Sequence, residues 1–332
     1  MSVEQGPKSR IVGVGAYAPE RVLTNFDLEK MVDTSDSWIR ERTGIRERRI
    51  AREDESTSDM ALVAARRALE MANLAPSDLD MIVVGTITGD TPMPACAAFL
   101  QNKLGITDIP AFDVSAACAG FLYALSIGDQ FIRTGMHRHV LVVGAELLSR
   151  VLDWQDRTTC VLFGDGAGAA VLGPATGDGR GVLSTKLHTD ATLVESLCIR
   201  AGGSKERITP AALEQKRDKV FMQGQDIFKV AVKNLTRASA SALSDAGLRA
   251  SDVRWVVPHQ ANLRIIAQVA QRLDISLDRF VLNIERYGNT SSASIPLALD
   301  EALRDGRIKP GDTVLMCALG GGISWASALI RL

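Results

Sequence analysis

The sequence predicts an α/β protein made of two related halves, and two observations support that fold class. The chain resembles itself at an offset of 174 positions, at which Ala68 falls on Ala242 and Asp78 falls on Asp252. Its apolar runs are continuous rather than alternating, which is typical of strands that helices cover on both faces. Separate segments share both the offset and the order of elements, so a duplication explains the match better than chance does.

The predicted elements follow the same order in each half. Strands are expected in the continuous apolar runs, and helices where apolar residues recur at helical spacing. In the first half the strands are Ile11–Val14, Met81–Val84, Val140–Val143 and Ala169–Leu172, and the helices include Met60–Ala72 and Phe121–Ile132. In the second half, strands at Trp255–Val257 and Thr313–Cys317 repeat two of these strands. The halves are predicted to be residues 1–178 and 179–332, with a site shared between them.

Length and composition narrow the functional classes. A chain of 332 residues exceeds the usual size of one core, and a hydrophobic fraction of 46% supports well-buried halves. The net charge of −1 gives no electrostatic case for binding nucleic acid or an anionic membrane. No apolar run reaches the roughly 18 residues that span a bilayer, and the first residues lack a signal-peptide pattern, so we expect a cytoplasmic protein. The cysteines are widely spaced without a Cys-x-x-Cys pair, which indicates neither disulfides nor a metal site.

Cys118 is the first candidate catalytic residue. It lies in the segment Asp113-Val-Ser-Ala-Ala-Cys-Ala-Gly-Phe121, where an apolar run leads into a helix expected from Ala119 to about Ile132. Unpaired N–H groups and the positive end of the helix dipole would then face the sulfur, and both would favour thiolate over thiol. A buried, inert cysteine is the alternative, and this segment alone does not decide between the two.

His259 and Asn289 are the candidates that would complete such a site. His259 follows a predicted strand, and open α/β sheets bind ligands beyond the carboxyl ends of their strands. Asn289 precedes a predicted helix, in a loop that corresponds to the Cys118 loop in the repeat. An asparagine there could simply cap the helix or a turn. The convergence of Cys118, His259 and Asn289 from matching strand ends favours a shared catalytic site.

Two glycine-rich segments remain. Leu319-Gly-Gly-Gly-Ile323 follows a buried strand, and consecutive glycines let backbone N–H groups approach a ligand and supply a donor of an oxyanion hole. It is no phosphate loop, because the lysine of that motif is missing, and no G-x-G-x-x-G follows the first strand. The segment Gly164–Gly168 leads directly into a strand and is interpreted as packing.

Together these segments resemble β-ketoacyl-acyl carrier protein synthase III, a family of the thiolase superfamily. The similarity extends over nearly the whole chain. It includes, in order, Asp36–Arg46, Ala116–Phe121, Phe163–Ala170, Pro258–Arg264, Tyr287–Ser291 and Gly320–Gly322. The resemblance implies a five-layered αβαβα thiolase-like fold of two halves related by a pseudo-twofold axis. It also implies a homodimer whose interface lies beside the active sites.

The resemblance implies an activity as well. It is the decarboxylative Claisen condensation of an acyl-CoA primer with malonyl-acyl carrier protein, which gives 3-oxoacyl-acyl carrier protein, CoA and CO₂ and initiates type II fatty acid synthesis. Cys118 would accept the acyl group, with the N–H groups of Cys118 and Gly322 as oxyanion hole. His259 and Asn289 would bind the malonyl thioester carbonyl. No cofactor or metal is implied, since acyl-CoA is a substrate.

Further residues carry over as contacts to the two substrates. Those matched to coenzyme A are Trp38 and Arg157 around the adenine, Arg42 at the phosphate region, and Gly224, Phe228 and Asn262 along the pantetheine arm. Basic positions matched to the acidic acyl carrier protein are Lys229 and Arg264. A solvated surface charge is the plain alternative for each basic residue.

Two positions depart from the family pattern. Where members often carry an aromatic residue that reaches across the dimer to bound the acyl tunnel, this chain has Met93. Methionine is unbranched and deformable, so it could admit a different or longer acyl chain, or it could be a packing substitution. Arg157 is followed by Thr158 where glycine is common, which leaves the coenzyme A pose open.

Other enzyme classes also use a nucleophilic cysteine, and related proteins can lack activity. A thiolase would use a second cysteine as base, but Cys317 lies in a strand-like apolar run and is interpreted as structural. The flank of a papain-like nucleophile is absent, and a non-enzymatic relative would be expected to lack Cys118, His259 or Asn289. The serious alternative is a synthase III-like acyltransferase or condensing enzyme of polyketide or specialised metabolism, with a different acceptor or extender.

Overall fold

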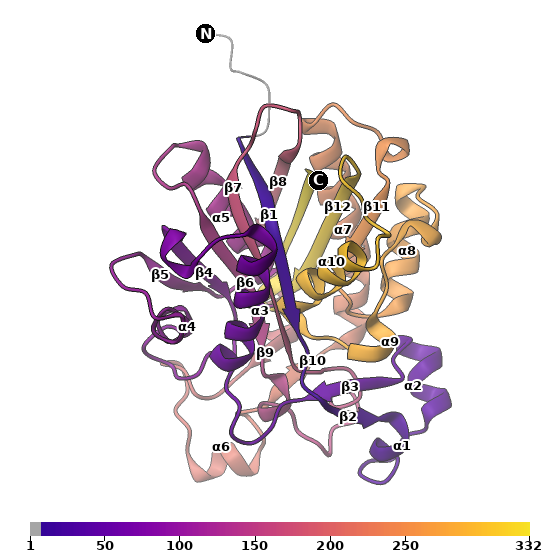
Figure 1. Ribbon diagram of the computed structural model, residues 1–332. Coiled ribbons are helices and arrows are strands. Elements are labelled where there is room, and N and C mark those ends of the chain that lie inside the picture. The colour runs from indigo at the N-terminus through magenta and orange to yellow at the C-terminus, as the bar shows by residue number, and fades with distance from the viewer. Residues whose placement is uncertain (1–7) are drawn as a thin grey trace.

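Two sheets with the same strand order form the frame of the molecule (Figure 1). The computed structural model describes residues 8–332. The first sheet has the order β1-β7-β6-β4-β5, and the second has the order β8-β13-β12-β11 when it is listed in the same sense. Beyond β11, Val256 forms an isolated bridge with Phe280, where the first sheet has β5. The predicted duplication is therefore present in the sheet topology.

Most of the strands are longer than the apolar runs that predicted them. The first sheet consists of β1 (Ser9–Tyr17), β4 (Met81–Gly85), β5 (Ala111–Val114), β6 (Val140–Glu146) and β7 (Gly166–Pro174). The second consists of β8 (Gly181–Thr189), β11 (Trp255–Pro258), β12 (Thr313–Gly320) and β13 (Ser324–Arg331). Two small pairs are β2 (Arg21–Thr24) with β3 (Glu47–Ile50), and β9 (Leu197–Ile199) with β10 (Val220–Met222). The extensions arise because antiparallel partners such as β1 and β7 pair along most of their length.

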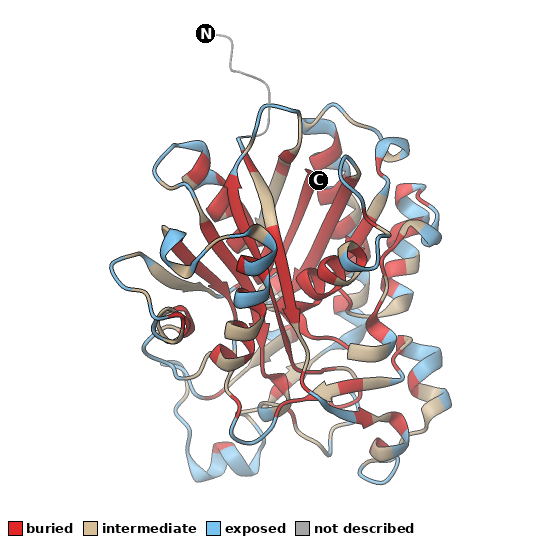
Figure 2. Cartoon of the chain, viewed as in Figure 1, coloured by how far each residue is buried: buried red, intermediate tan, exposed pale blue. Residues whose placement is uncertain are grey.

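The longer helices form three layers around the sheets (Figure 1). Helices α5 (Gly120–Arg133) and α10 (Ser294–Arg304) lie between the sheets and share one apolar core with both. Helices α3 (Thr57–Ala72) and α4 (Cys96–Leu104) cover the outer face of the first sheet. Helices α7 (Gly224–Asp245) and α8 (Leu263–Leu273) cover the second. The predicted αβαβα layering is confirmed, and burial is greatest in the sheets and central helices (Figure 2).

The shorter helices lie at the ends of this frame. They are α1 (Asn25–Leu28), α2 (Asp36–Thr43), α6 (Pro210–Glu214) and α9 (Ile284–Tyr287), with 3-10 turns that include η2 (Ala117–Ala119), η7 (Ser291–Ala293) and η8 (Gly321–Ile323). At the offset of 174 positions, η2 falls on η7 and the first residue of α5 falls on the first residue of α10. The duplication therefore extends to the loops that precede the central helices.

Two sequence interpretations bear on this frame. A side chain at Gly168 would lie 2.6 Å from Pro296, so the glycine-rich start of β7 does serve close packing against α10. The boundary between residues 178 and 179 falls between β7 and β8, but the central helices belong to one common core, so that division stays a prediction. Within residues 8–332, no helix is long and apolar enough to cross a membrane.

Candidate active site

Cys118 lies where the two halves meet. The turn η2 precedes α5, and Ala117 has a positive φ of 44°, so the chain turns sharply just before the cysteine. The end of β12 approaches from the other half, where a Cβ atom at Gly320 would lie 2.5 Å from the Cys118 nitrogen. The glycine at position 320 is therefore required for the two halves to touch at the cysteine.

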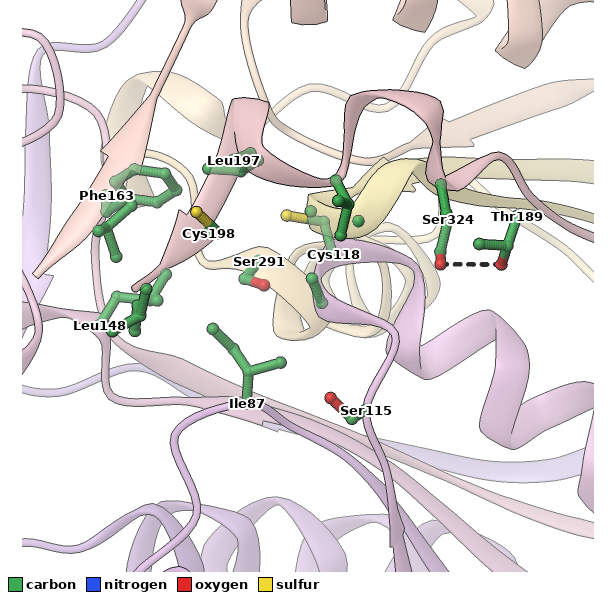
Figure 3. Close-up of a pocket in the computed structure, with 17 residues that line it drawn as sticks. Ile87, Ser115, Cys118, Leu148, Phe163, Thr189, Leu197, Cys198, Ser291 and Ser324 are labelled. Atoms are coloured by element: carbon green, nitrogen blue, oxygen red, sulfur yellow. Dashed lines mark hydrogen bonds between the residues drawn. The ribbon is translucent and has the colours of Figure 1, made fainter. Parts of the chain in front are cut away.

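Cys118 borders a cavity of about 530 Å³ to which both halves contribute (Figure 3). Its sulfur points into the space, and only 7% of the residue is exposed. The walls are largely apolar and include Ile87, Leu148, Phe163, Val194 and Leu197, and Gly322 and Ser291 also line the cavity. A thiol at the wall of an apolar cavity is suited to carry an apolar group.

The prediction that the thiolate is favoured is contradicted by the burial of the thiol. Burial raises the pKa of the Cys118 thiol to about 12, and the nearby Glu146 raises it further, although the Ser291 hydroxyl lowers it. The cysteine precedes α5 but lies within the protein interior, where loss of solvation of the charged form outweighs the helix dipole. The resting residue is therefore a neutral thiol that has to lose its proton during the reaction.

His259 follows β11 directly and is held from both sides. Its backbone N–H donates to the Cys317 carbonyl at 2.8 Å, and its ring Nδ1 lies 2.6 Å from the Ser294 hydroxyl oxygen. Nε2 is buried and has no hydrogen-bond partner in the described chain. Burial lowers the pKa of His259 to about 3, so the imidazole is neutral. A neutral ring with an unpartnered buried nitrogen is set up to bind a polar group of a ligand.

Gln260 fixes this loop and was not identified from the sequence. Its amide nitrogen donates to the carbonyls of Pro258 and Val281, and its amide oxygen accepts the N–H groups of Asn283 and Ile284. All these bonds lie in the protein interior. The residue stands next to His259 in the quoted Pro258–Arg264 motif, and that position is the one signal that could have singled it out.

Asn289 is locked by its backbone and its side chain. Its N–H donates to the Leu162 carbonyl, and its carbonyl accepts the Gly164 N–H. The amide oxygen accepts the Ser291 N–H at 2.8 Å, so the NH₂ group is the end of the side chain that is left to donate. The asparagine does form a turn, but it does not cap α10, whose N-cap is Ala293.

The candidate residues are linked through neighbouring segments rather than by one cavity, since His259 and Asn289 do not line the cavity that Cys118 borders. Ser291 and Gly322 line the same cavity as Cys118. Asn289 stands two residues before Ser291, and the His259 ring is bonded to the first residue of α10, which follows η7 directly. Ser291, Gln260, Glu146 and the second cavity thiol, Cys198, were not singled out from the sequence. Glu146 and Ser291 could not be, because their contact joins distant segments of the chain.

The three residues matched to the nucleotide end of coenzyme A also lie together. The Arg42 and Arg157 guanidinium carbons lie 5.0 Å and 5.2 Å from the centre of the Trp38 ring. Arg157 also donates to the Asp33 carbonyl at 2.9 Å. An adenine between Trp38 and Arg157 would need about 7 Å, twice a van der Waals contact, so Arg157 has to move outward on binding.

The three positions matched to the pantetheine arm differ in their surroundings. Asn262 caps α8 by accepting the Arg264 N–H, and its amide nitrogen donates to the Arg42 carbonyl at 3.0 Å. Gly224 is exposed at the start of α7, and Phe228 is partly buried against the outer apolar core of the second sheet. Their role toward a ligand stays a prediction.

The remaining predicted positions are at the surface. Lys229 and Arg264 are exposed on α7 and α8, two helices that pack against each other. Met93 is 85% exposed and does not line the cavity of its own chain. An exposed apolar side chain of this size is compatible with the predicted reach into a partner subunit, which stays a prediction.

Cys317 behaves as predicted for a structural residue. It is fully buried within β12, and burial raises the pKa of its thiol to about 12.

Among residues 8–332, no cluster of three or more His, Cys, Asp or Glu side chains could hold a metal ion.

Comparisons with known proteins agree with this geometry. The family model of 3-oxoacyl-[acyl-carrier-protein] synthase III matches residues 112–191, and the model of its C-terminal part matches residues 243–332. A β-ketoacyl-[acyl-carrier-protein] synthase III from Caldanaerobacter subterraneus subsp. tengcongensis is 51% identical over 321 residues, which is 97% of each chain.

Solved structures extend the similarity to the fold. A 3-oxoacyl-[acyl-carrier-protein] synthase III from Aquifex aeolicus has a TM-score of 0.90 and 46% identity, covering 98% of this chain and 100% of the other. A priming β-ketosynthase from a polyketide biosynthetic pathway has a TM-score of 0.91 and 39% identity, covering 100% of this chain and 98% of the other. The chain belongs to the β-ketoacyl-[acyl-carrier-protein] synthase III family and is a condensing enzyme of the acyltransferase class.

Proposed function

We propose that the protein condenses an acyl-CoA primer with malonyl-acyl carrier protein, releasing CoA and CO₂, and so initiates type II fatty acid synthesis. The observation that supports this most is a thiol at the wall of an apolar cavity, in a chain that also holds a buried imidazole nitrogen without a partner and an oriented amide. Membership of the synthase III family supports the assignment of the two substrates.

In the first step, Cys118 takes the acyl group from coenzyme A. Its sulfur attacks the thioester carbonyl, and the apolar cavity receives the acyl chain. The tetrahedral oxyanion accepts hydrogen bonds from the N–H groups of Cys118 and Gly322, two residues that line the same cavity. The φ of 70° at Gly322 favours glycine at this position.

In the second step, His259 and Asn289 stabilise an enolate. The Ser294 oxygen accepts the Gln260 N–H, and we propose that the Ser294 hydroxyl donates its own hydrogen to His259 Nδ1. This arrangement puts the ring proton on Nε2, which then donates to the malonyl thioester oxygen together with the Asn289 NH₂ group. Loss of CO₂ leaves a carbanion that attacks the acyl-cysteine. Burial keeps the pKa of His259 low, so the ring stays neutral. The enolate oxygen is therefore stabilised by two neutral hydrogen-bond donors.

Substrate delivery uses the outer rim. Trp38, Arg42 and Arg157 bind the nucleotide end of coenzyme A through stacking and charge, as their clustering supports. Gly224, Phe228 and Asn262 border the path of the pantetheine arm. Lys229 and Arg264 meet the acidic acyl carrier protein, and their effect is chiefly on encounter and salt dependence.

The assembly is proposed to be a cytoplasmic homodimer in which Met93 reaches the acyl cavity of the partner subunit. The exposure of Met93 supports this contact. Replacement of Met93 by Phe would then shorten the longest accepted primer without lowering the rate for the shortest one. Sedimentation would show whether the protein is a dimer at all.

A two-stage turnover experiment tests the proposed function. The protein is first incubated with a series of acyl-CoAs and freed of CoA, and malonyl-acyl carrier protein is then added. Release of CO₂ and of 3-oxoacyl-acyl carrier protein from the loaded protein supports the proposal. A loaded protein that malonyl-acyl carrier protein does not discharge would instead support an acyltransferase with another acceptor.

A further inference from the structure

Glu146 is a buried carboxylate at the end of β6 that none of these steps uses. Its Oε2 accepts hydrogen bonds from the hydroxyls of Thr86 and Thr88 and from the N–H of Ile87. The two threonine oxygens themselves accept the N–H groups of Thr88 and Leu147, so each hydroxyl passes its one hydrogen to Oε2. With three donors on Oε2, a proton taken up by Glu146 has to arrive at Oε1.

Oε1 faces the duplicated loop of the second half. The Ser291 hydroxyl donates to it at 3.1 Å. Ser292 also approaches Oε1, at 3.5 Å, but it lies closer to the Gly85 carbonyl, to which it donates at 2.7 Å. Ser291 is therefore the group that can exchange a proton with Glu146.

The Ser291 hydroxyl also reaches Cys118. Both side chains line the same cavity (Figure 3), and hydrogen bonding by the Ser291 hydroxyl lowers the pKa of the Cys118 thiol. A hydroxyl has one hydrogen and two lone pairs, so it can accept from the thiol while it donates to the carboxylate. Reversing both bonds gives a thiolate that accepts from Ser291, which in turn accepts from a protonated Glu146.

We propose that Ser291 and Glu146 form a proton relay that activates Cys118 for acyl transfer. This proposal rests on the proposed function in so far as Cys118 is the acyl acceptor. As the sulfur forms its bond to the thioester carbon, its proton moves to Ser291 Oγ, and the Ser291 hydrogen moves to Glu146 Oε1. The bond from that carbon to the CoA sulfur then breaks, and the departing thiolate takes the proton back through Ser291. Atoms and charge balance, and Glu146 is a positioning residue that acts through Ser291.

The surroundings of Glu146 favour this use. The elements around it present the hydroxyls of Thr86, Thr88, Ser291 and Ser292, and the titratable group facing it is the Cys118 thiol. Burial raises the pKa of Glu146 to about 7, although hydrogen bonds from its donors lower it. A group that titrates near neutral pH can both accept and return a proton.

If Glu146 acted only through its negative charge, its removal would change the reactivity of Cys118 in the opposite direction. Its negative charge raises the pKa of the Cys118 thiol, so removing that charge alone would make the thiol more reactive. Loss of a relay would make it less reactive. The reactivity of Cys118 in a charge-removing variant therefore separates the two roles.

The test is peptide-resolved alkylation by iodoacetamide across neutral pH, in the wild type and in Glu146→Gln and Ser291→Ala. The wild-type rate at Cys118 is expected to rise through a step near pH 7, the pKa of Glu146. Each variant should lose that step and react at least about 10-fold more slowly above it. The double variant should be no slower than either single variant, since both interrupt one relay.

Two controls show that a slower reaction is specific. Cys198 lines the same cavity, so its alkylation reports access and should not change. Glu55→Gln alters another buried carboxyl group, bonded to Tyr17, and should leave the Cys118 profile intact. If Glu146→Gln fails to fold, Ser291→Ala alone tests the relay.

A rate at Cys118 equal to or above wild type in folded Glu146→Gln, or a step that is retained in folded Ser291→Ala, would overturn the relay. Because iodoacetamide replaces acyl-CoA, this result is independent of the substrate. A wild type with the step but without any acyl-CoA adduct would contradict the proposed function and leave the relay standing.

Discussion

The Cys118 loop and its duplicate, the Ser291–Ser292 loop, have the same backbone and different chemistry. Ala117 and Ser291 are equivalent in the repeat and have φ values of 44° and 49°. Ser292 occupies the position of Cys118, yet it is only 1% exposed and donates to the Gly85 carbonyl. One loop therefore presents its side chain to a cavity, and the other buries it.

The difference lies in what faces each loop. Gly320 at the end of β12 has no side chain next to Cys118, and at the offset of 174 positions it corresponds to Glu146 at the end of β6. Glu146 contacts Ser291 and Ser292 and has no space left around it. The duplicated frame therefore has a cavity beside Cys118 of one loop but not beside the equivalent Ser292 of the other. The end of β12 next to Cys118 has a glycine, whereas the end of β6 has Glu146, which fills the space beside Ser292.

Exchanging the two side chains breaks the comparison most severely. In the double variant Cys118→Ser and Ser292→Cys, the thiol moves to the equivalent backbone position in the other half. Acyl transfer should fall by at least about 10⁴-fold, because the new thiol is buried away from the cavity. Mass spectrometry of the peptides after incubation with acyl-CoA checks this. An acyl group found at position 292 would show that the backbone alone defines the nucleophile.

Removing the imidazole should separate the two steps. In His259→Ala, discharge of the acyl-enzyme by malonyl-acyl carrier protein should fall about 100-fold or more, since a donor to the enolate oxygen is lost. Loading of Cys118 should change little, because His259 is bonded to Ser294 rather than to the thiol. Single-turnover assays measure both rates. An equal loss of loading and discharge would give His259 a role in the first step.

Adding one methyl group at Gly320 should disturb the contact between the end of β12 and the Cys118 loop. In Gly320→Ala the new Cβ atom would lie 2.5 Å from the Cys118 nitrogen, so the backbone has to move. We expect a loss of about 3 kcal/mol in the free energy of unfolding and slower loading of Cys118. Gly203→Ala, where a Cβ would meet nothing within 4 Å, is the matched control. Denaturant titration with unchanged stability in Gly320→Ala would contradict the close approach.

The buried carboxyl group of Glu146 should make the free energy of unfolding depend on pH. Burial raises the pKa of Glu146 from 4.5 to about 7, so between these values the folded protein holds a proton that the unfolded chain has lost. The wild type therefore loses stability as pH rises through this window, and Glu146→Gln should not. The gain of the variant over wild type should grow by roughly 3 kcal/mol and level off above pH 7. A difference that does not depend on pH would place the Glu146 pKa at its ordinary value.

The frame could be predicted from the sequence, and candidate catalytic residues could be named, because both depend on local patterns. The repeat and the continuous apolar runs gave two sheets, and motifs at strand ends located Cys118, His259 and Asn289. The Glu146–Ser291 contact was missed because it joins residues 145 positions apart. The thiolate prediction was wrong for a related reason. A helix dipole can be inferred from a segment, whereas the burial that raises the pKa of Cys118 depends on the whole fold.

Intact-protein mass spectrometry after incubation with acyl-CoA tests most directly whether Cys118 carries the acyl group. The predicted result is a shift by one acyl group in the wild type, mapped to the Cys118 peptide, absent in Cys118→Ala and reversed by malonyl-acyl carrier protein. A shift that persists in Cys118→Ala, or no shift with any acyl-CoA, would contradict the assignment of Cys118 as the nucleophile.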